Sequence, residues 1–263
     1  TVASAGAFKS SFGGVWDGYV AKFNTSGGRV WSTYYGSTSL DELEEITLDK
    51  LNNIYVVGSS RSTTGISTTG SHQATHSGGT RDGVFAKFNS SGTQIWSSYF
   101  GGTSFDYIYS IFADSDTSIY MVGTTNSSSG ISTPNSRRPI KSTNSTYDGF
   151  VTKFSLNGIV DWSTYVHGDG YAVTPLDVYV KNDTSIFVSG EADGGIRELT
   201  FGFYHNYSGN EDRGFILKFN AKGKLKIATD LSEQTESHGV RSSSQGKIYV
   251  GGERSVSPGG VYA

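Results

Sequence analysis

Residues able to do acid–base or metal chemistry are scattered through this sequence. The five histidines all fall in predicted loops or turns: His72, His76, His167, His205 and His238. Two of them lie four residues apart and would share one face only on a helix, but their segment, GSHQATHSGG, has no helical pattern. We expect the histidines to be structural or solvated, and none to ligate a metal.

Carboxylates are most concentrated in one acidic run, which consists of Asp41, Glu42, Glu44 and Glu45. Strict alternation along a strand would divide this run between two faces. It therefore predicts a solvated edge rather than an acid–base pair. Asp114 and Asp116 lack the remaining ligands and the glycine of a calcium loop, so we expect them in a turn.

Short catalytic motifs are missing from the sequence. It contains no Walker A motif, no GxSxG and no HExxH. The string GDGYAV, which starts at Gly168, has two glycines but no third and no helical pattern after it, so a phosphate cradle is not expected. We predict no catalytic residue, no cofactor-binding residue and no metal ligand, and we expect a protein that is not an enzyme.

Composition narrows the class of protein. The 263 residues include 35 glycines, 13% aromatic and only 17% charged residues, which is typical of strands joined by many tight turns. A formal charge of −3 with dispersed Lys and Arg predicts no binding to nucleic acid, and no apolar run is long enough to predict membrane insertion. The absence of Cys excludes disulfides. Because Thr1 is not an initiator Met, we expect a chain that was processed or excised from a longer precursor.

An internal repeat dominates the sequence. Its clearest landmarks are DGYVAKF, DGVFAKF, DGFVTKF and RGFILKF, which start 65 or 66 residues apart at Asp17, Asp82, Asp148 and Arg213. In the first three repeats a Trp follows eight residues after the Phe, and a segment of the type IYVVG comes later. Period-2 alternation between Gly, Asn and Ser turns predicts four strands per repeat, in the first at about 18–23, 29–35, 43–49 and 53–59.

Four antiparallel strands per repeat predict the blade of a β-propeller. We expect the Trp residues in the layers between blades, and the first strand of each repeat beside the central channel. Loops of about 20 residues, at 60–81, 125–147 and 191–212, are expected to be ordered because GISTTG and GISTPN recur in them. The polar residues that recur on the first strand predict either a structural network between blades or a ring that binds anions or sugars: Asp17, Asp82, Asp148, Lys22, Lys87, Lys153 and Lys218.

The succession DGxVxKF, WSTYxGG and IYVxG resembles the repeat of the SBBP-type, or "seven-bladed", β-propeller family of bacterial and archaeal secreted and cell-surface proteins. The resemblance covers nearly the whole chain and is clearest at 17–147. It implies a repeat class rather than an activity. Two departures are four repeats instead of seven, and a fourth repeat with Arg213 and Ile227 in place of the Asp and the Trp.

The predicted fold is therefore all-β: a β-propeller with four blades of four antiparallel strands. We expect one propeller domain over 1–263, with repeats at 17–81, 82–147, 148–212 and 213–263, the last completed by 1–16. Such complementary ends would either close the ring within one chain or continue into another copy, which gives an open or head-to-tail array.

Six Asn-x-Ser/Thr sequons are candidate N-glycosylation sites: Asn24, Asn89, Asn126, Asn144, Asn182 and Asn206. With the repeats and the lack of a catalytic motif, they predict an extracellular or cell-surface glycoprotein that is structural or adhesive, such as a subunit of a fibre or coat. Its partners would be itself, head-to-tail or laterally, or surface glycans. The alternatives are a carbohydrate-binding propeller lectin, favoured by Trp16, Tyr107 and Tyr147 if they are exposed, and a hydrolase or lyase on a propeller scaffold.

Overall fold

The computed structural model describes residues 2–114, 117–168, 170, 172–182, 184–196, 212–233 and 235–254. These residues form sixteen strands and no helix, so no described helix could cross a membrane. The first repeat supplies β1 (Gly18–Phe23), β2 (Arg29–Tyr35), β3 (Asp41–Leu48) and β4 (Ile54–Ser60). Each observed strand lies within two residues of its predicted position.

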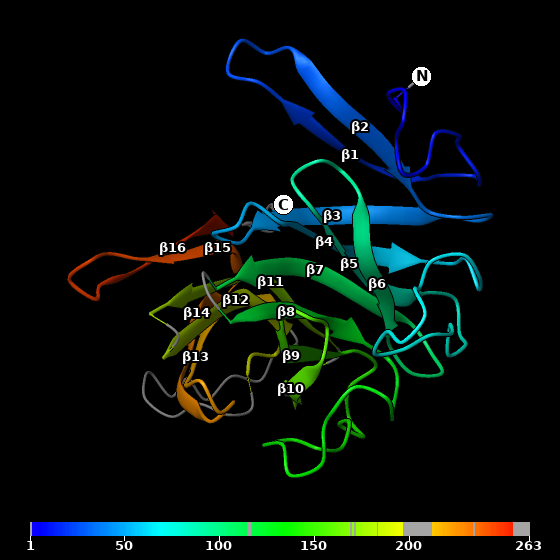
Figure 1. Ribbon diagram of the computed structural model, residues 1–263. Helices are drawn as coiled ribbons and strands as arrows, with labels where there is room; N and C mark the ends of the chain where they lie inside the picture. Colours follow the sequence, from blue (N-terminus) through cyan, green and yellow to red (C-terminus); the bar gives the residue numbers. More distant parts are fainter. Residues whose placement is uncertain are drawn as a thin grey trace, which may run out of the picture.

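The strands assemble into three complete four-stranded antiparallel sheets and two hairpins (Figure 1). The first sheet contains β3, β4, β5 (Asp82–Phe88) and β6 (Gln94–Phe100). The second contains β7 (Asp106–Ala113), β8 (Ser118–Thr125), β9 (Asp148–Ser155) and β10 (Val160–Val166). The third contains β11 (Val173–Lys181), β12 (Ser185–Asp193), β13 (Asp212–Phe219) and β14 (Leu225–Glu233).

The two hairpins are half-blades. The N-terminal half-blade is β1–β2, and the C-terminal half-blade is β15 (Thr235–Ser242) with β16 (Ile248–Arg254). They form separate sheets within the described chain, and β15–β16 projects from the body of the molecule (Figure 1). The predicted class of four-stranded propeller blades is confirmed, with three complete blades among the described residues, and the completion of the last repeat by residues 1–16 stays a prediction.

The blades are displaced by half a repeat from the sequence repeats. The DG strands β5, β9 and β13 are the third strands of their sheets, whereas β3, β7, β11 and β15 are the first strands and pack against one another in succession. The prediction that the DG strand lines the channel was therefore wrong. Each blade combines the last two strands of one repeat with the first two strands of the next.

A β-bulge recurs in every innermost strand. The register shifts between Leu43 and Glu45 in β3, and at equivalent places in β7, β11 and β15. The bulge pushes a backbone carbonyl towards the second strand, where a side chain at Gly58 would overlap the carbonyl oxygen of Glu42. The same constraint explains the glycine of every IYVxG-type segment: Gly58, Gly123, Gly190 and Gly252.

The core lies between successive sheets and is rich in aromatic and β-branched residues. As predicted, the repeat Trp residues join blades. The indole N–H of Trp31 donates to Ser90 O at 3.1 Å, in the β5–β6 turn of the next blade. Trp96 and Trp162 donate in the same way to Leu156 O and Ala221 O, at 3.3 and 2.9 Å.

The long loops cover the outer edges of the blades. In the first loop, the amide of Thr68 donates to Ser97 O and the amide of Tyr99 donates to Gln73 O, so the loop runs along the free edge of β6. The second loop covers β10 in the same way, through Thr133 and Arg138. This arrangement hides backbone groups that could otherwise pair with other chains. The predicted order of both loops is confirmed, whereas most of the third loop lies outside the described residues.

Candidate functional site

The recurring DG carboxylates are buried beneath the loops rather than aimed at a channel. The side chains of Asp17, Asp82 and Asp148 are fully buried. Each accepts a hydrogen bond from a loop amide: Gly13 N at 2.9 Å, Ser77 N at 2.7 Å and Ser142 N at 2.6 Å, respectively. The same geometry in three repeats supports the structural alternative over an anion- or sugar-binding ring.

Each of the three buried carboxylates has a different side-chain partner. Lys9 Nζ lies 2.9 Å from Asp17 Oδ2, and Gln73 Nε2 lies 3.0 Å from Asp82 Oδ2. His167 Nε2 lies 3.5 Å from Asp148 Oδ2. Burial raises the pKa of Asp82 to about 6, and burial also lowers the pKa of its neighbour His76. These groups anchor loops and form no open acid–base site.

A second set of carboxylates begins the innermost strands. Asp106 accepts hydrogen bonds from Gly102 N at 2.8 Å, from Ser127 Oγ at 2.9 Å and from Thr125 Oγ1. Its pKa is raised to about 7 because burial disfavours the charged form more strongly than these donors favour it. Asp41 is held in the equivalent way, by Ser37, Ser60 and Ser62.

The acidic run 41–45 is only in part the predicted solvated edge: Glu44 is exposed on the edge strand β3, whereas Asp41 is buried. It forms most of β3, and the bulge breaks the alternation on which that prediction depended. Glu42 Oε2 pairs with Arg81 Nη1 at 2.5 Å, and Glu44 accepts the phenol of Tyr107. Burial and these carboxylates raise the pKa of Tyr107. The run connects β3 to its neighbouring blade.

One hydrogen bond repeats along the central strands. The side chain after each bulge accepts the amide of a residue on the next innermost strand: Ile111 N donates to Glu45 Oε2 at 2.7 Å, and Val178 N to Ser110 Oγ at 3.1 Å. In the third case Val240 N donates to Asp177 Oδ2 at 2.7 Å. These bonds fix neighbouring blades to each other at the axis.

Two variants of Asp177 separate this bond from its ion pair. Arg241 contacts the same carboxylate at 2.5 Å, but 62% of its side chain is exposed, so the charge pair contributes little. We expect Asp177→Asn, which keeps an acceptor for Val240, to cost less than about 1 kcal/mol of unfolding free energy, and Asp177→Ala about 2 kcal/mol. Urea unfolding checks this; equal losses in the two variants would contradict it.

One cluster of the described residues has the donor types of a metal site. His238 Nε2 lies 3.4 Å from Glu236 Oε2 and 3.7 Å from Glu253 Oε1, on the C-terminal half-blade. His238 therefore lies in strand β15 and not in the predicted loop. All three groups are at least one-third exposed, and exposed acidic groups of this kind are common without an ion. The prediction of no metal ligand stays a prediction.

The sequon asparagines lie at or near the surface. Asn24, Asn144 and Asn182 are exposed, Asn89 and Asn126 are half-buried, and Asn206 lies outside the described residues. The Oδ1 atom of Asn24 accepts the amides of Ser26 and Gly28, and Asn89 holds its turn in the same way. Asn220 does so without a sequon. The recurrence of Asn24 and Asn89 therefore has a structural reason, and their glycosylation stays a prediction.

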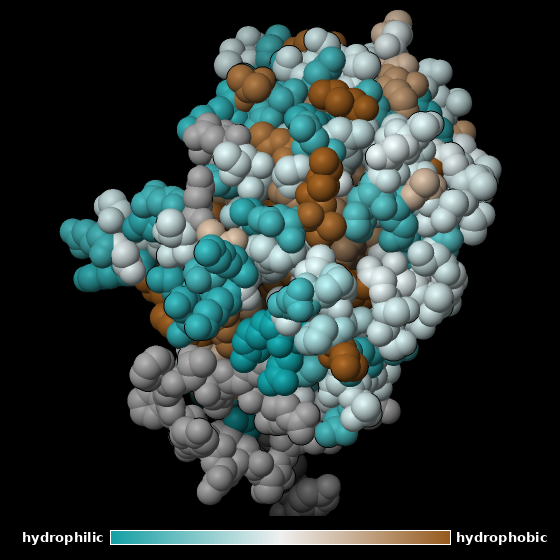
Figure 2. Space-filling model, turned by 60° about the horizontal axis from the view of Figure 1, so that its bottom comes forward, coloured by the Kyte–Doolittle hydropathy of each residue, from teal (hydrophilic) through white to brown (hydrophobic). Residues whose placement is uncertain are grey.

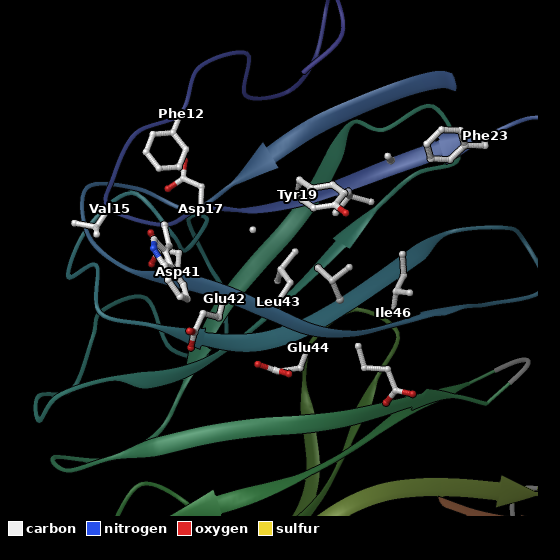
Figure 3. A pocket seen from close by; sticks show the side chains of 16 residues that line it. Phe12, Val15, Asp17, Tyr19, Phe23, Asp41, Glu42, Leu43, Glu44 and Ile46 are labelled. Carbon is white, nitrogen blue, oxygen red and sulfur yellow. The ribbon is translucent and has the colours of Figure 1, made fainter. Parts of the chain in front are cut away.

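Of the aromatic residues that favoured a lectin, only Trp16 is largely exposed, at 61%. Tyr147 is half-buried, and the expectation of an exposed Tyr107 was wrong, because it is 9% exposed and bonded to the acidic run. A groove of about 820 Å³ lies between β1 and β3. Figure 3 shows Phe12, Tyr19 and Phe23 along one side of it, and Leu43 and Ile46 along the other.

Figure 2 shows one face of the molecule, on which apolar side chains form separate small patches among polar ones. The groove is lined by Tyr19 and Phe23 of β1 and by Leu43 and Ile46 of β3. Its walls are apolar above the acidic run, and it lies at the open side of β3.

A β-propeller repeat family model matches residues 30–64 and 95–130. Each matched segment runs from the fourth strand of one blade through the first two strands of the next. Among curated proteins, none matches the chain. With the bladed sheets and the repeat pattern, these matches show that the chain contains β-propeller repeats of the SBBP type at residues 30–64 and 95–130.

Proposed function

We propose that this chain is a non-enzymatic structural protein of the cell surface or extracellular space, a building unit of a fibre or coat. The observation that carries the proposal is the use made of the recurring polar residues. Asp17, Asp82 and Asp148 hold loops, while Glu45 and Asp177 hold neighbouring blades. Because these recurring polar groups hold the fold together, they favour a structural protein over an enzyme.

The surface is consistent with this role. Exposed sequons and long loops rich in Ser and Thr offer attachment points for glycans, and the loops hide the blade edges that could pair without specificity. Among the described residues, acid and base groups converge where Glu236, His238 and Glu253 lie near the carboxylates of Glu191, Asp193 and Asp212. The match of two segments to a β-propeller repeat family is consistent with this proposal, because such repeats are a scaffold whose activity depends on grafted sites.

Glycopeptide mass spectrometry and electron microscopy of natively prepared material test the proposal. We expect glycan on at least the exposed Asn24 and Asn144, together with ordered particles larger than one chain. Substituting each asparagine by Gln should remove the corresponding mass increment. Bare asparagines in a strictly monomeric protein at high concentration would contradict the proposed function.

A further inference from the structure

A polar pocket of about 600 Å³ lies at the junction of the second and third complete blades. The second long loop lines one side of it with residues 133–137, and the β13–β14 turn lines the other side with residues 222–224. Strand β10 contributes Asp161 and Trp162. All of these residues belong to complete blades, and the volume lies within the range of about 300–1,000 Å³ that is usual for small-ligand sites.

The backbone around this pocket repeats the arrangement at the preceding junction, between the first and second blades. In both junctions a loop threonine amide donates to a serine carbonyl on the fourth strand, at 2.9 and 3.0 Å: Thr68 to Ser97 and Thr133 to Ser163. In both, a turn glycine of the next blade faces the ring of the repeat Trp: Gly158 with Trp96 and Gly223 with Trp162. The packing of the blades therefore explains the backbone of the pocket.

The side chains at the two junctions differ in charge. Three cationic residues of the pocket replace residues of the preceding junction that carry no permanent charge: Arg137 for His72, Lys222 for Asn157 and Lys224 for Ile159. The hollow at the preceding junction has a volume of only about 50 Å³, and His72 packs there with its ring centre 5.0 Å from that of Phe154. Because the preceding junction folds without these cations, blade packing does not require them.

The backbone holds the three cations at the rim of the pocket. On the loop side, the amide that follows Arg137 donates to Thr164 Oγ1 at 2.9 Å. On the turn side, Asn220 Oδ1 accepts the amides of Lys222 and Lys224 at 3.1 and 2.9 Å. Two segments that are far apart in the sequence thus present positive charge to one hollow.

The lining also offers a hydrogen-bond acceptor. Partial burial and the neighbouring Arg138 lower the pKa of Arg137, so positive charges already repel one another here and an anion would relieve the repulsion. Asp161, which pairs with Lys153 Nζ at 3.0 Å, is 56% exposed on the same lining. An inorganic sulfate has acceptors alone, whereas an acidic saccharide has both an anionic group for the cations and hydroxyl groups that can donate to Asp161.

We infer that this pocket binds an acidic saccharide, whose carboxylate or sulfate group contacts Arg137, Lys222 and Lys224 and whose hydroxyl groups donate to Asp161. The inference rests on the proposed function at the cell surface or in the extracellular space, and it names a partner for that function. The partner is a polymer that contains sugar acids or sulfated sugars.

Isothermal titration calorimetry with two charged probes, tetragalacturonate and a sulfated chondroitin tetrasaccharide, tests the inference. We expect at least one of them to bind, with an affinity that falls as the salt concentration rises. Uncharged cellotetraose and inorganic sulfate should bind at least about tenfold more weakly than that probe. Failure of both charged probes to bind, or equally tight binding of cellotetraose or of sulfate, would overturn the inference.

Variants locate the binding. Arg137→His and Lys222→Asn install the residues of the preceding junction, where the same backbone is formed, and each should raise the dissociation constant roughly 5- to 20-fold. Lys50→Asn is the matched control: it removes an exposed lysine from the β3–β4 turn of the first blade and should leave the constant within about 2-fold. Asp161→Asn should weaken binding of the saccharide but strengthen binding of sulfate, because it removes a negative charge.

The outcomes separate this inference from the proposed function. Equal effects of Lys50→Asn and the two pocket variants, or no effect of any of them, would place the saccharide elsewhere and overturn the pocket. That result leaves the structural function standing, because glycan on the sequons and assembly are measured without added saccharide. Bare, strictly monomeric protein that still binds the charged probe through Arg137 and Lys222 would remove the fibre or coat and leave the pocket.

Discussion

Replacing Gly123 by Ala is expected to lower the free energy of unfolding by at least about 3 kcal/mol. A Cβ atom at this position would overlap the carbonyl oxygen of Tyr107 and lie 2.7 Å from Cζ of Phe150. The backbone of the bulged strand β7 cannot move away from this Cβ atom without breaking the pairing of β7 with β8. Because the Tyr107 carbonyl and the Phe150 ring both lie in the centre of a blade, neither can shift towards solvent to relieve the overlap.

Gly239→Ala is the matched control, because this glycine also adjoins a bulge but only Asp177 Oδ2, at 3.8 Å, approaches a Cβ built there. We expect its unfolding free energy to change by less than about 1 kcal/mol. Urea denaturation with far-ultraviolet circular dichroism measures both variants. If the two glycines tolerate Ala equally well, the explanation of the IYVxG glycine by the bulge is wrong.

A change from pH 8 to pH 5 is expected to stabilise the protein, and the buried carboxyl of Asp106 should contribute about 2–4 kcal/mol of this gain. Its pKa of about 7 in the folded state exceeds the ordinary value of an unfolded Asp, so the folded protein binds more protons between about pH 4 and 7. Stability is therefore highest at the acidic end of this window and declines as the pH rises through 7. Asp82, whose pKa is raised to about 6, acts in the same direction.

Asp106→Asn should flatten this dependence because an amide does not ionise and still offers an acceptor to Gly102 N and to one hydroxyl. The control is Asp161→Asn, which changes a carboxylate that is 56% exposed. The unfolding free energies of the wild-type protein, Asp106→Asn and Asp161→Asn, measured at pH 5, 6, 7 and 8, test this prediction. A wild-type protein whose stability rises over this range would show that the Asp106 carboxylate is stabilised in the fold instead.

The strands could be predicted from the sequence because hairpin turns and period-2 alternation are local signals. Which strands belong to one blade could not be predicted, because a periodic chain of hairpins does not indicate which strand begins a sheet. The DG strand was assigned to the channel for this reason, whereas it is the third strand. The recurring IYVxG glycine was a usable signal, because it marks the strand that faces a bulge.

Site residues were predictable only where their role is local. The acidic run was misplaced because one extra residue, Glu44, shifts the alternation that the prediction assumed. The pairing of an aromatic ring on the second strand with a lysine on the third, such as Tyr55 with Lys87 at 5.0 Å, was within reach of the sequence, because both residue types recur at fixed positions. It joins two strands that are separated by a long loop. The exposure of Tyr107 depended on contacts from another blade, which no local pattern reports.

Hydrogen exchange in the wild-type protein and in Asp82→Ala tests most directly whether the recurring carboxylates hold the loops. We expect the amide of Ser77, which donates to Asp82 Oδ2 at 2.7 Å, to be protected in the wild-type protein and to exchange rapidly in the variant, while the amides of β8 stay protected in both. A Ser77 amide that exchanges at the same rate in both proteins would contradict the structural role of this carboxylate.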